Sequence, residues 1–431
     1  MYRKLFFWGN VVLFVLLILA IAKDTFRPWM PYQRAYRRMQ AAAEAAPEAR
    51  RIILGRPIQI KQTILTDLGE VDRCITCHQG MDPIATPTLA NAFTDNPHKA
   101  HPSDFLKNHP PETFGCVTCH RGQGLSTTFI DAGHTPRDEA QKAAWKKKHG
   151  WEPADHWEYP MLTGPYLQAS CVKCHGDFES LHGLEAAVRG KRLLRAHGCM
   201  GCHQWRGEGG PVSVDLAEET ANKPLSRIDF SNTGLDPEDR TLLNWIRLHF
   251  VKDPWALVPG DPAAKYNAEP IAPSGMPDFR DELSEEDAAA LTTYILSGQS
   301  ANIPHTYHVS GPKEPTFQSL RFGSRAQAGK WVYDQYGCAG CHGLNGKGGR
   351  RNFNYTGGLE PALVKSVATF TREELREKIE DGVMVVTKED PQGPTPPLYM
   401  PPWKDKIKGE EMEALLDYLF SIGEKQEEWG G

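Results

Sequence analysis

The residues best suited to chemistry in this 431-residue chain are its ten cysteines, because every one lies in a Cys-x-x-Cys-His unit. The cysteine pairs are Cys74 and Cys77, Cys116 and Cys119, Cys171 and Cys174, Cys199 and Cys202, and Cys338 and Cys341. The histidines that follow them are His78, His120, His175, His203 and His342. In such a unit the two thiols form thioethers to a porphyrin, and the histidine offers the iron a neutral nitrogen ligand. We therefore expect five covalently bound haem c groups, each with one of these histidines as its proximal iron ligand.

Two other kinds of site also use paired cysteines. A single Cys-x-x-Cys can be half of a zinc site or a redox-active pair. Neither a zinc site nor a disulfide framework explains why a histidine follows the second cysteine in all five units. Haem attachment accounts for all ten cysteines and all five histidines together.

An apolar segment near the N-terminus predicts a membrane anchor. Arg3 and Lys4 precede an apolar run from Leu5 to Ala22, which as a helix would be roughly 27 Å long, enough to span a bilayer core. The alternative is a cleaved signal peptide, for which Ala20 and Ala22 offer a small-x-small site. Haem c is attached outside the cytoplasm, so we expect a single span in the cytoplasmic (inner) membrane, with the rest of the chain in the periplasm or extracytoplasmic space.

The basic residues after this run complicate the orientation. Counting charges alone would place them on the cytoplasmic side. We let the attachment of haem c outside the cytoplasm override this count, and expect them on the outer side. These residues are Lys23, Arg27, Arg34, Arg37 and Arg38. The alanine-rich stretch 33–51 is predicted to be helical up to Pro47, as a stalk against lipid headgroups or a partner subunit, or as a plain solvated helix. The formal net charge of −5 and the lack of a basic, aromatic-rich patch exclude a nucleic-acid partner.

The C-terminal half of the chain contains an internal duplication. "GCMGCHQWRGEGG" (198–210) matches "GCAGCHGLNGKGG" (337–349) at an offset of 139 residues, which also relates Gly190-Lys191 to Gly329-Lys330. "ALTTYILSG" (290–298) matches "ALLDYLFSIG" (414–423) at an offset of 124 residues. The first copy therefore has about fifteen extra residues, in the Pro- and Asp-rich stretch around 252–270.

Each copy resembles a class I cytochrome c domain. Its order is an N-terminal helix with Gly-Lys, the Cys-x-x-Cys-His unit, a glycine loop, a middle helix, Met-Pro and a last amphipathic helix. The resemblance implies that the methionine of Met-Pro, Met276 in the first copy and Met400 in the second, is the distal iron ligand. A lone methionine is otherwise a filler of the core.

Start and stop signals place the helices of both copies. Asp236-Pro237 predicts the start of the first middle helix, as N-cap and first-turn proline. Thr371 and Glu374 form a capping box for the second, which Gly382 ends. The last helices are predicted to begin near Ser284 and Glu410. Their apolar residues repeat at spacings of three and four, which predicts one face toward the haem; they are Leu291, Tyr294 and Ile295 in the first copy, and Leu415, Tyr418 and Leu419 in the second.

The stretch 66–185 carries three units in about 120 residues, with little helical periodicity and many Pro, Gly and His. It resembles the compact multihaem domains of membrane-anchored cytochromes, and the resemblance implies histidine on both sides of each iron. The favoured distal ligands are His101, His109, His134 and His156, one more than three haems need, and a surface histidine is the alternative for each. The other histidines available are His98, His149 and His182, and Met81 and Met161 are further alternatives.

The expected fold is mainly α with much irregular structure. It comprises an N-terminal transmembrane helix, a compact trihaem domain and two tandem class I cytochrome c domains. The expected parts are a transmembrane anchor (1–22), a basic helical stalk (23–65), the trihaem domain (66–185), a cytochrome c domain (186–300), a linker (301–324) and a second cytochrome c domain (325–431).

The function implied is electron transfer, because the sequence contains no catalytic triad, phosphate loop or dinucleotide motif, and an iron with both axial positions filled cannot bind substrate. The chain resembles the multihaem cytochrome subunits of quinol-oxidising complexes, of the bc type or alternative complex III. The resemblance implies integral-membrane quinol-oxidising subunits as partners and a soluble cytochrome or terminal oxidase as acceptor. The alternatives are a multihaem reductase or peroxidase with one open-coordinate haem, and a terminal relay to minerals.

Overall fold

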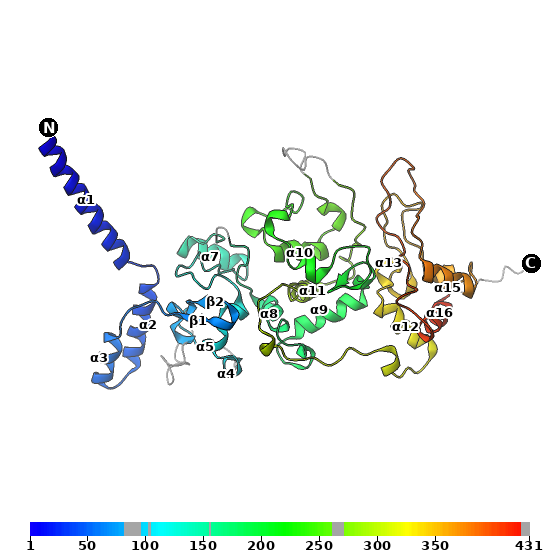
Figure 1. Cartoon of the computed structure of the whole chain (residues 1–431), viewed down its shortest axis with the longest axis horizontal. Helices are drawn as coiled ribbons and strands as arrows, with labels where there is room; N and C mark the ends of the chain where they lie inside the picture. Colours follow the sequence, from blue (N-terminus) through cyan, green and yellow to red (C-terminus); the bar gives the residue numbers. More distant parts are fainter. Residues whose placement is uncertain (82–95, 102–104, 155–156, 261–270, 424–431) are drawn as a thin grey trace, which may run out of the picture. The chain divides into compact units, whose positions relative to one another are not determined.

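The computed structural model describes residues 1–81, 96–101, 105–154, 157–260 and 271–423, and divides the chain into two compact units, Met1–Thr163 and Gly164–Gly431 (Figure 1). Helices predominate and strands are few and short, which confirms the predicted fold class. The third Cys-x-x-Cys-His unit lies in the second compact unit, together with both copies of the duplicated segment. The predicted domain boundaries remain predictions.

In the first unit, the described residues form seven α-helices and a small hairpin of two strands. The elements are α1 (Tyr2–Thr25), α2 (Met30–Ala43), α3 (Pro47–Gly55), β1 (Thr63–Leu65), η1 (Thr66–Leu68), β2 (Glu70–Asp72), η2 (Cys74–Thr76), η3 (Gln79–Met81), α4 (Phe105–Asn108), α5 (Pro111–Phe114), α6 (Val117–His120) and α7 (Glu139–His149). β1 and β2 are antiparallel, with Ile64 opposite Val71. Among the described residues, α1 alone is long and apolar enough to cross a membrane, a test that a signal sequence would also pass.

The predicted stalk is a pair of helices packed against each other and onto the first motif. α2 ends at Ala43, and Pro47 begins α3 as a first-turn proline rather than only ending a helix. Gln33 of α2 is 1 % exposed, and its Nε2 donates to the carbonyls of Gln59 (2.7 Å) and Thr76 (3.0 Å). Because Thr76 lies between the cysteines of the first motif, these bonds tie α2 to the first Cys-x-x-Cys-His unit.

In the second unit, the two copies use equivalent helices. The α-helices and strands are α8 (Gln168–Val172), α9 (Glu185–Ala196), β3 (Gln204–Trp205), β4 (Glu208–Gly209), α10 (Leu242–Val251), α11 (Glu285–Leu296), α12 (Arg325–Gln335), α13 (Ala339–His342), α14 (Leu363–Ser366), α15 (Arg372–Asp381) and α16 (Glu410–Ile422). The short turns are η4 (Gly164–Leu167), η5 (Phe178–Ser180), η6 (Cys199–Gly201), η7 (Leu216–Thr220), η8 (Leu225–Arg227), η9 (Pro237–Asp239), η10 (Pro254–Leu257), η11 (His305–Tyr307), η12 (Phe317–Ser319) and η13 (Leu344–Gly346).

In each copy the first and last helices cross at a glycine. A Cβ on Gly190 of α9 would lie 2.1 Å from the carbonyl oxygen of Ala290 in α11, and one on Gly329 of α12 would lie 1.9 Å from that of Ala414 in α16. Only glycine allows two helix backbones to approach so closely. The apolar faces predicted for the last helices are buried at these crossings.

The predicted helix starts are confirmed with one exception. α11 begins after Ser284, α16 begins at Glu410, and α15 has the Thr371–Glu374 capping box and ends at Gly382. The start predicted for the first middle helix is wrong. Asp236 and Pro237 instead open the short turn η9, and α10 starts after Thr241, whose Oγ1 accepts the backbone N–H of Asn244 at 3.1 Å. Both threonine and aspartate suit an N-cap, and the hydroxyl nearer to the apolar run is the one that caps it.

Candidate functional site

All five Cys-x-x-Cys-His units adopt the same turn. In each, the backbone N–H of the histidine donates to the carbonyl oxygen of the first cysteine, at 2.9–3.0 Å. A helical turn brings positions i, i+3 and i+4 to one face, so both thiols and the imidazole lie on the same side. None of the ten cysteines, all within the described ranges, forms a disulfide. The units therefore fit covalent attachment of a porphyrin whose iron faces the histidine.

Polar contacts of Nδ1 orient the imidazoles of three of the five motif histidines. The Nδ1–H of His203 donates to the Val214 carbonyl at 2.8 Å, and that of His342 donates to the Pro361 carbonyl at 3.1 Å. The Nδ1 of His175 lies 3.3 Å from a carboxylate oxygen of Asp177. A carbonyl can only accept, so Nδ1 carries the proton and Nε2 keeps its lone pair for a metal.

Burial favours the neutral, metal-binding form of four motif histidines, His78, His120, His203 and His342. It lowers the pKa of His78 to about 4, with smaller contributions from nearby histidines. It also lowers the pKa of His120, His203 and His342. Neutral imidazole is the form in which histidine ligates iron.

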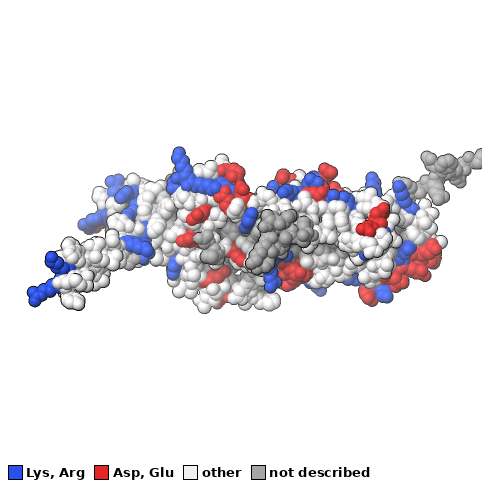
Figure 2. All heavy atoms as spheres, turned by 90° about the horizontal axis from the view of Figure 1, so that it is seen from above, with Lys and Arg blue, Asp and Glu red and all other residues white. Residues whose placement is uncertain are grey.

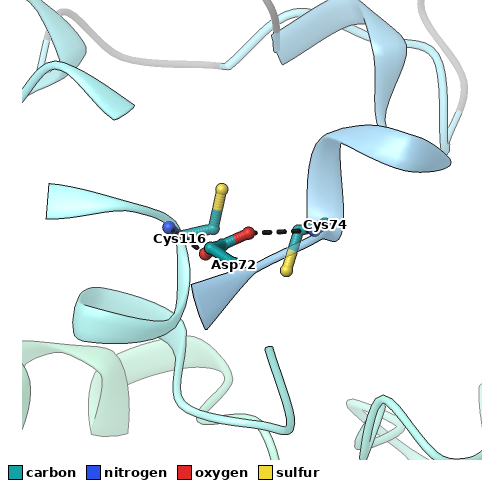
Figure 3. A group of neighbouring side chains, drawn as sticks. All are labelled: Asp72, Cys74 and Cys116. Carbon is teal, nitrogen blue, oxygen red and sulfur yellow. Dashed lines mark hydrogen bonds between the residues drawn. The ribbon is translucent and has the colours of Figure 1, made fainter. Parts of the chain in front are cut away.

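A buried aspartate joins the first two motifs (Figure 3). Asp72, at the end of β2, is 2 % exposed. Its Oδ1 accepts the backbone N–H of Cys74 at 2.9 Å, and its Oδ2 accepts those of Cys116, at 2.5 Å, and Val117, at 3.0 Å. The ligand atoms of Asp72, Cys74 and Cys116 lie within 4.8 Å of one another. Because both cysteines belong to Cys-x-x-Cys-His units and the carboxylate accepts backbone N–H groups, we interpret this cluster as the junction of two motifs rather than a separate metal site.

The first two motif histidines each lie near a second histidine. The ring centres of His78 and His134 are 6.1 Å apart, and those of His120 and His101 are 6.4 Å apart. With metal–imidazole bonds of about 2 Å, two imidazoles on opposite sides of one metal ion would have ring centres roughly 6 Å apart. The Nδ1–H of His134 donates to the Phe129 carbonyl at 2.7 Å, so Nε2 is the unprotonated ring nitrogen. Both pairs therefore have the spacing of axial ligands.

The remaining candidate histidines have other contacts or lie outside the described residues, and their assignment stays a prediction. The His109 ring packs on Phe114, with centres 5.2 Å apart, and that of His149 stacks on Phe129 at 4.2 Å. His98 is buried beside Tyr36, with ring centres 5.4 Å apart. His182 is exposed, and His156 lies outside the described residues.

Met81 and Met161, the methionine alternatives, lie close to the first two motifs. Met81 ends the turn η3, three residues after His78, and its N–H donates to the His78 carbonyl at 3.1 Å. The Met161 side chain lies 2.7 Å from the position of a Cβ on Gly122, two residues after His120.

The methionines predicted as distal ligands in the duplicated part have different surroundings. Met400 packs against the buried core of the second copy, together with Cys338 of its motif, and its backbone pairs with Val383. Met276 is partly buried, and its neighbour Gly275 lies against Pro397 and Leu398 of the second copy. Both ligand assignments remain predictions.

The motifs of the two copies meet at four glycines. A Cβ on Gly198 would lie 2.2 Å from the nitrogen of Gly340, and one on Gly337 would lie 2.1 Å from the nitrogen of Gly201. The offset of 139 residues relates Gly198 to Gly337 and Gly201 to Gly340, so the contact is reciprocal, as in a two-fold interface. It brings the Sγ atoms of Cys202 and Cys341 to 3.7 Å.

Sequence reasoning missed Asp72 and the glycine junction. An acid two residues before a motif gives no sign that it also binds a second motif. The glycines had a visible signal, since both motifs read Gly-Cys-x-Gly-Cys-His, but nothing in the pattern says that the two copies touch there.

Comparison with known proteins identifies the duplicated segment. The cytochrome c family model matches residues 187–299 and 326–423. Neither the curated proteins nor the solved structures gave a match. Cytochrome c domains bind haem c covalently and transfer electrons, and proteins of this kind are usually extracytoplasmic. The chain therefore contains two cytochrome c domains, each with its own Cys-x-x-Cys-His unit, which supports its assignment as a c-type cytochrome.

Proposed function

We propose that the chain is a pentahaem c-type cytochrome that transfers electrons at the outer face of the membrane, from a quinol-oxidising membrane partner to a soluble cytochrome or terminal oxidase. Haem, when bound, supplies an iron that takes up and releases one electron. The ten motif cysteines would hold the five groups, and the five motif histidines would be the proximal ligands.

The observation that carries this proposal is that four of the five motifs meet in pairs. Asp72 binds the first turns of motifs one and two, and the thiols of Cys202 and Cys341 in motifs four and five are 3.7 Å apart. A protein that used each haem separately would have no need to place attachment sites in contact. Close attachment sites suit passage of an electron between neighbouring groups.

Filled axial positions favour electron transfer over catalysis at the iron. The proposed axial pairs are His78 with His134, His120 with His101, and His342 with Met400. A histidine–methionine pair raises the reduction potential relative to two histidines. We therefore place the donor side at the first unit and the acceptor side at the cytochrome c domains.

Charge supports contact of the first unit with a membrane surface. Residues 1–56 contain ten Lys and Arg against three Asp and Glu. In Figure 2 the slender helix at the left of the view is mostly white with basic side chains at its tip, and further basic side chains lie on the N-terminal part beside it. Anionic headgroups attract such segments by about 1 kcal/mol for each basic residue near the surface. The helix pair α2–α3 would then lie at the membrane, below the first motif.

The acceptor side carries acidic residues. In Figure 2 acidic side chains gather over the C-terminal cytochrome c domain at the right of the view. Glu373 and Glu377 of α15 and Glu410 of α16 are exposed there. An acidic face of this kind suits a soluble cytochrome with a basic face, because complementary charges accelerate association.

A redox titration with optical and EPR detection, beside a pyridine haemochrome assay, tests the proposal. We expect five haems per chain, all resistant to acid–acetone extraction and low-spin when oxidised. A count of three or fewer overturns the pentahaem assignment. A high-spin haem in the native protein would instead favour the reductase or peroxidase class.

The membrane assignment has its own test. A chain lacking residues 1–22, exported by a cleavable signal, should be soluble and carry the same haem content. If the truncated chain still sediments with partner-free vesicles of anionic lipid, the apolar helix is not the only membrane contact.

The acceptor side is tested by salt and charge reversal. The rate at which the reduced chain reduces a basic soluble cytochrome should fall several-fold between low and high ionic strength, and also in the double variant Glu373→Lys, Glu377→Lys. Glu152→Lys, an exposed change in the first unit, is the matched control and should leave the rate unchanged. Equal effects of both changes would contradict an acceptor site on α15.

A further inference from the structure

His134, the histidine that lies near His78, is held by two different parts of one phenylalanine. Its Nδ1–H donates to the backbone carbonyl of Phe129 at 2.7 Å. The ring of Phe129 also stacks on the imidazole, with ring centres 4.4 Å apart and planes at 8°. The backbone of Phe129 therefore fixes one nitrogen of His134, while its side chain covers one face of the same ring.

A tight turn between the two residues produces this double contact. The N–H of Ala132 donates to the carbonyl of Thr128 at 3.3 Å. The N–H of Gly133 donates to the carbonyl of Ile130 at 2.9 Å, and Gly133 has a φ of +76°, in the left-handed region that favours glycine. The turn reverses the chain, so that the rings of residues 129 and 134 lie against each other.

The segment around α7 supports the stacked rings from outside. The Trp145 ring of α7 packs edge-on against both, with its centre 5.1 Å from that of Phe129 and 6.2 Å from that of His134. His149 also stacks on Phe129, at 4.2 Å. Trp151 is 7 % exposed, and its Nε1–H donates to the His134 carbonyl at 2.7 Å. Closely packed rings of this kind leave neither Phe129 nor His134 room to rotate.

The orientation of the imidazole matters because the two histidine pairs of the first unit differ in it. The ring planes of His78 and His134 are 31° apart, whereas those of His120 and His101 are 73° apart. In a haem with two imidazole ligands, the π electrons of each ring interact with the iron d orbital perpendicular to that ring. Nearly parallel rings therefore separate two d orbitals in energy and give a rhombic low-spin EPR signal. Nearly perpendicular rings leave the two orbitals close in energy and give a signal with one large g value.

From these contacts we infer that Phe129 is a positioning residue of the first haem. Its carbonyl sets the tautomer of His134, and its ring sets the rotation of His134 about the iron–nitrogen axis. This inference rests on the proposed haem at His78 with His134 as its distal ligand. Neighbours of a metal-bound imidazole orient the ring without touching the metal. The first and second haems would then have the same kinds of ligand but different EPR signals.

The test uses the EPR spectrum of the oxidised, full-length, haem-loaded chain. His134→Ala identifies the signal of the first haem, because it should remove one rhombic low-spin signal and leave the large-g signal of the second haem. Phe129→Leu keeps the backbone carbonyl but removes the stacked ring. We expect this variant to shift or broaden the same rhombic signal, with the other signals and the pyridine haemochrome count unchanged. Phe129→Tyr keeps the ring and should retain the wild-type signal.

Phe105→Leu is the matched control. The Phe105 carbonyl also accepts the Nδ1–H of a histidine, His109 at 3.1 Å, but the Phe105 ring is 56 % exposed. This variant should leave every EPR signal unchanged.

Three results would overturn the inference. The first is an unchanged rhombic signal in Phe129→Leu, and the second is an equal change in Phe129→Tyr, which would point to the turn rather than the ring. The third is an unchanged spectrum of His134→Ala, since His134 would then not be a ligand. The pyridine haemochrome count of the wild type distinguishes these failures from failure of the proposed function, because an absent haem lowers the count whereas a misplaced ligand does not.

Discussion

At the scale of single residues, the chain places backbone hydrogen bonds where they orient ligand side chains. His203 and His342 each use Nδ1 on a carbonyl from the loop that follows their motif. Asp72 goes further, because one carboxylate accepts three N–H groups from two motifs. These bonds fix where the thiols and imidazoles point before any cofactor contributes.

Replacing Asp72 by asparagine should therefore affect two motifs together. The amide has one acceptor oxygen in place of two, so at least one buried N–H loses its partner, at a cost of about 1–3 kcal/mol. We expect a lower unfolding temperature and reduced haem content, measured by thermal denaturation and pyridine haemochrome. Asp131→Asn, at an exposed aspartate of the same unit, is the control. A haem content and stability equal to the control would show that the junction does not depend on this carboxylate.

At the scale of elements, each cytochrome c domain depends on the crossing of its first and last helices. Gly329 and Gly190 occupy equivalent positions, and each lies against a backbone carbonyl of the partner helix. The packing around the second crossing is fully buried, with Val332, Tyr333 and Leu416 at 0 % exposure. Such a core cannot relax to accept another side chain without moving a helix.

Gly329→Val should accordingly separate α12 from α16. The Cβ of the introduced side chain would meet the Ala414 carbonyl, which is backbone and cannot rotate away. We therefore expect the free energy of unfolding to fall by about 3 kcal/mol or more. Denaturant unfolding followed by absorbance in the Soret region would measure this loss of stability. Ala326→Val, one turn earlier at a partly exposed site of α12, is the matched control and should cost less than about 1 kcal/mol. Similar losses for both variants would mean that the helix propensity of valine, and not the crossing, sets the effect.

At the scale of the whole molecule, the second compact unit is held together by contacts between its two cytochrome c domains. The four-glycine junction joins the motifs, and an ion pair lies beside it. Arg350 of the second copy is 7 % exposed, and its guanidinium donates to both carboxylate oxygens of Glu282 in the first copy. His197, next to the fourth motif, binds the same carboxylate at 3.1 Å. This arrangement ties the geometry of the haem junction to a charge network.

Glu282→Gln should weaken this junction in a pH-dependent way. The bonds from His197 and Arg350 lower the pKa of Glu282 to about 2. The ionised carboxylate therefore stabilises the folded chain fully above the unfolded-state pKa of about 4.3, and this stabilisation is lost as the pH falls toward 2. At neutral pH we expect Glu282→Gln to lower the free energy of unfolding by about 1–2 kcal/mol, after allowance for the partial exposure of the pair.

Denaturant unfolding across pH 3–7 provides the measurement. The difference between wild type and Glu282→Gln should shrink toward pH 3, where the carboxyl group begins to take up its proton. Glu285→Gln, which removes an exposed pair with Arg247, is the control and should change stability by less than about 0.5 kcal/mol. A difference independent of pH would argue against the ionised form of Glu282 as its source.

The chemistry and the repeated architecture could be predicted from the sequence, because both depend on local spacing. A Cys-x-x-Cys-His unit forms one helical turn wherever it lies, and all five do so here. The last helices and the cap at Thr371 were predicted correctly because their signals lie within four residues of the helix start. The start at Asp236 was predicted wrongly because two residues nearby could cap the same apolar run, and local pattern does not rank them.

What only the tertiary structure decided is which residues from distant segments meet. Seven histidines were available in and around the first three motifs, and the fold brings His134 to His78 and His101 to His120. Asp72 reaches a motif 44 residues away, and the two copies touch at Cys202 and Cys341, 139 residues apart. Such contacts depend on the packing of whole elements, which residue spacing along the chain does not encode. The chain thus specifies by itself what each motif can bind, whereas the folded structure determines which motifs lie next to one another.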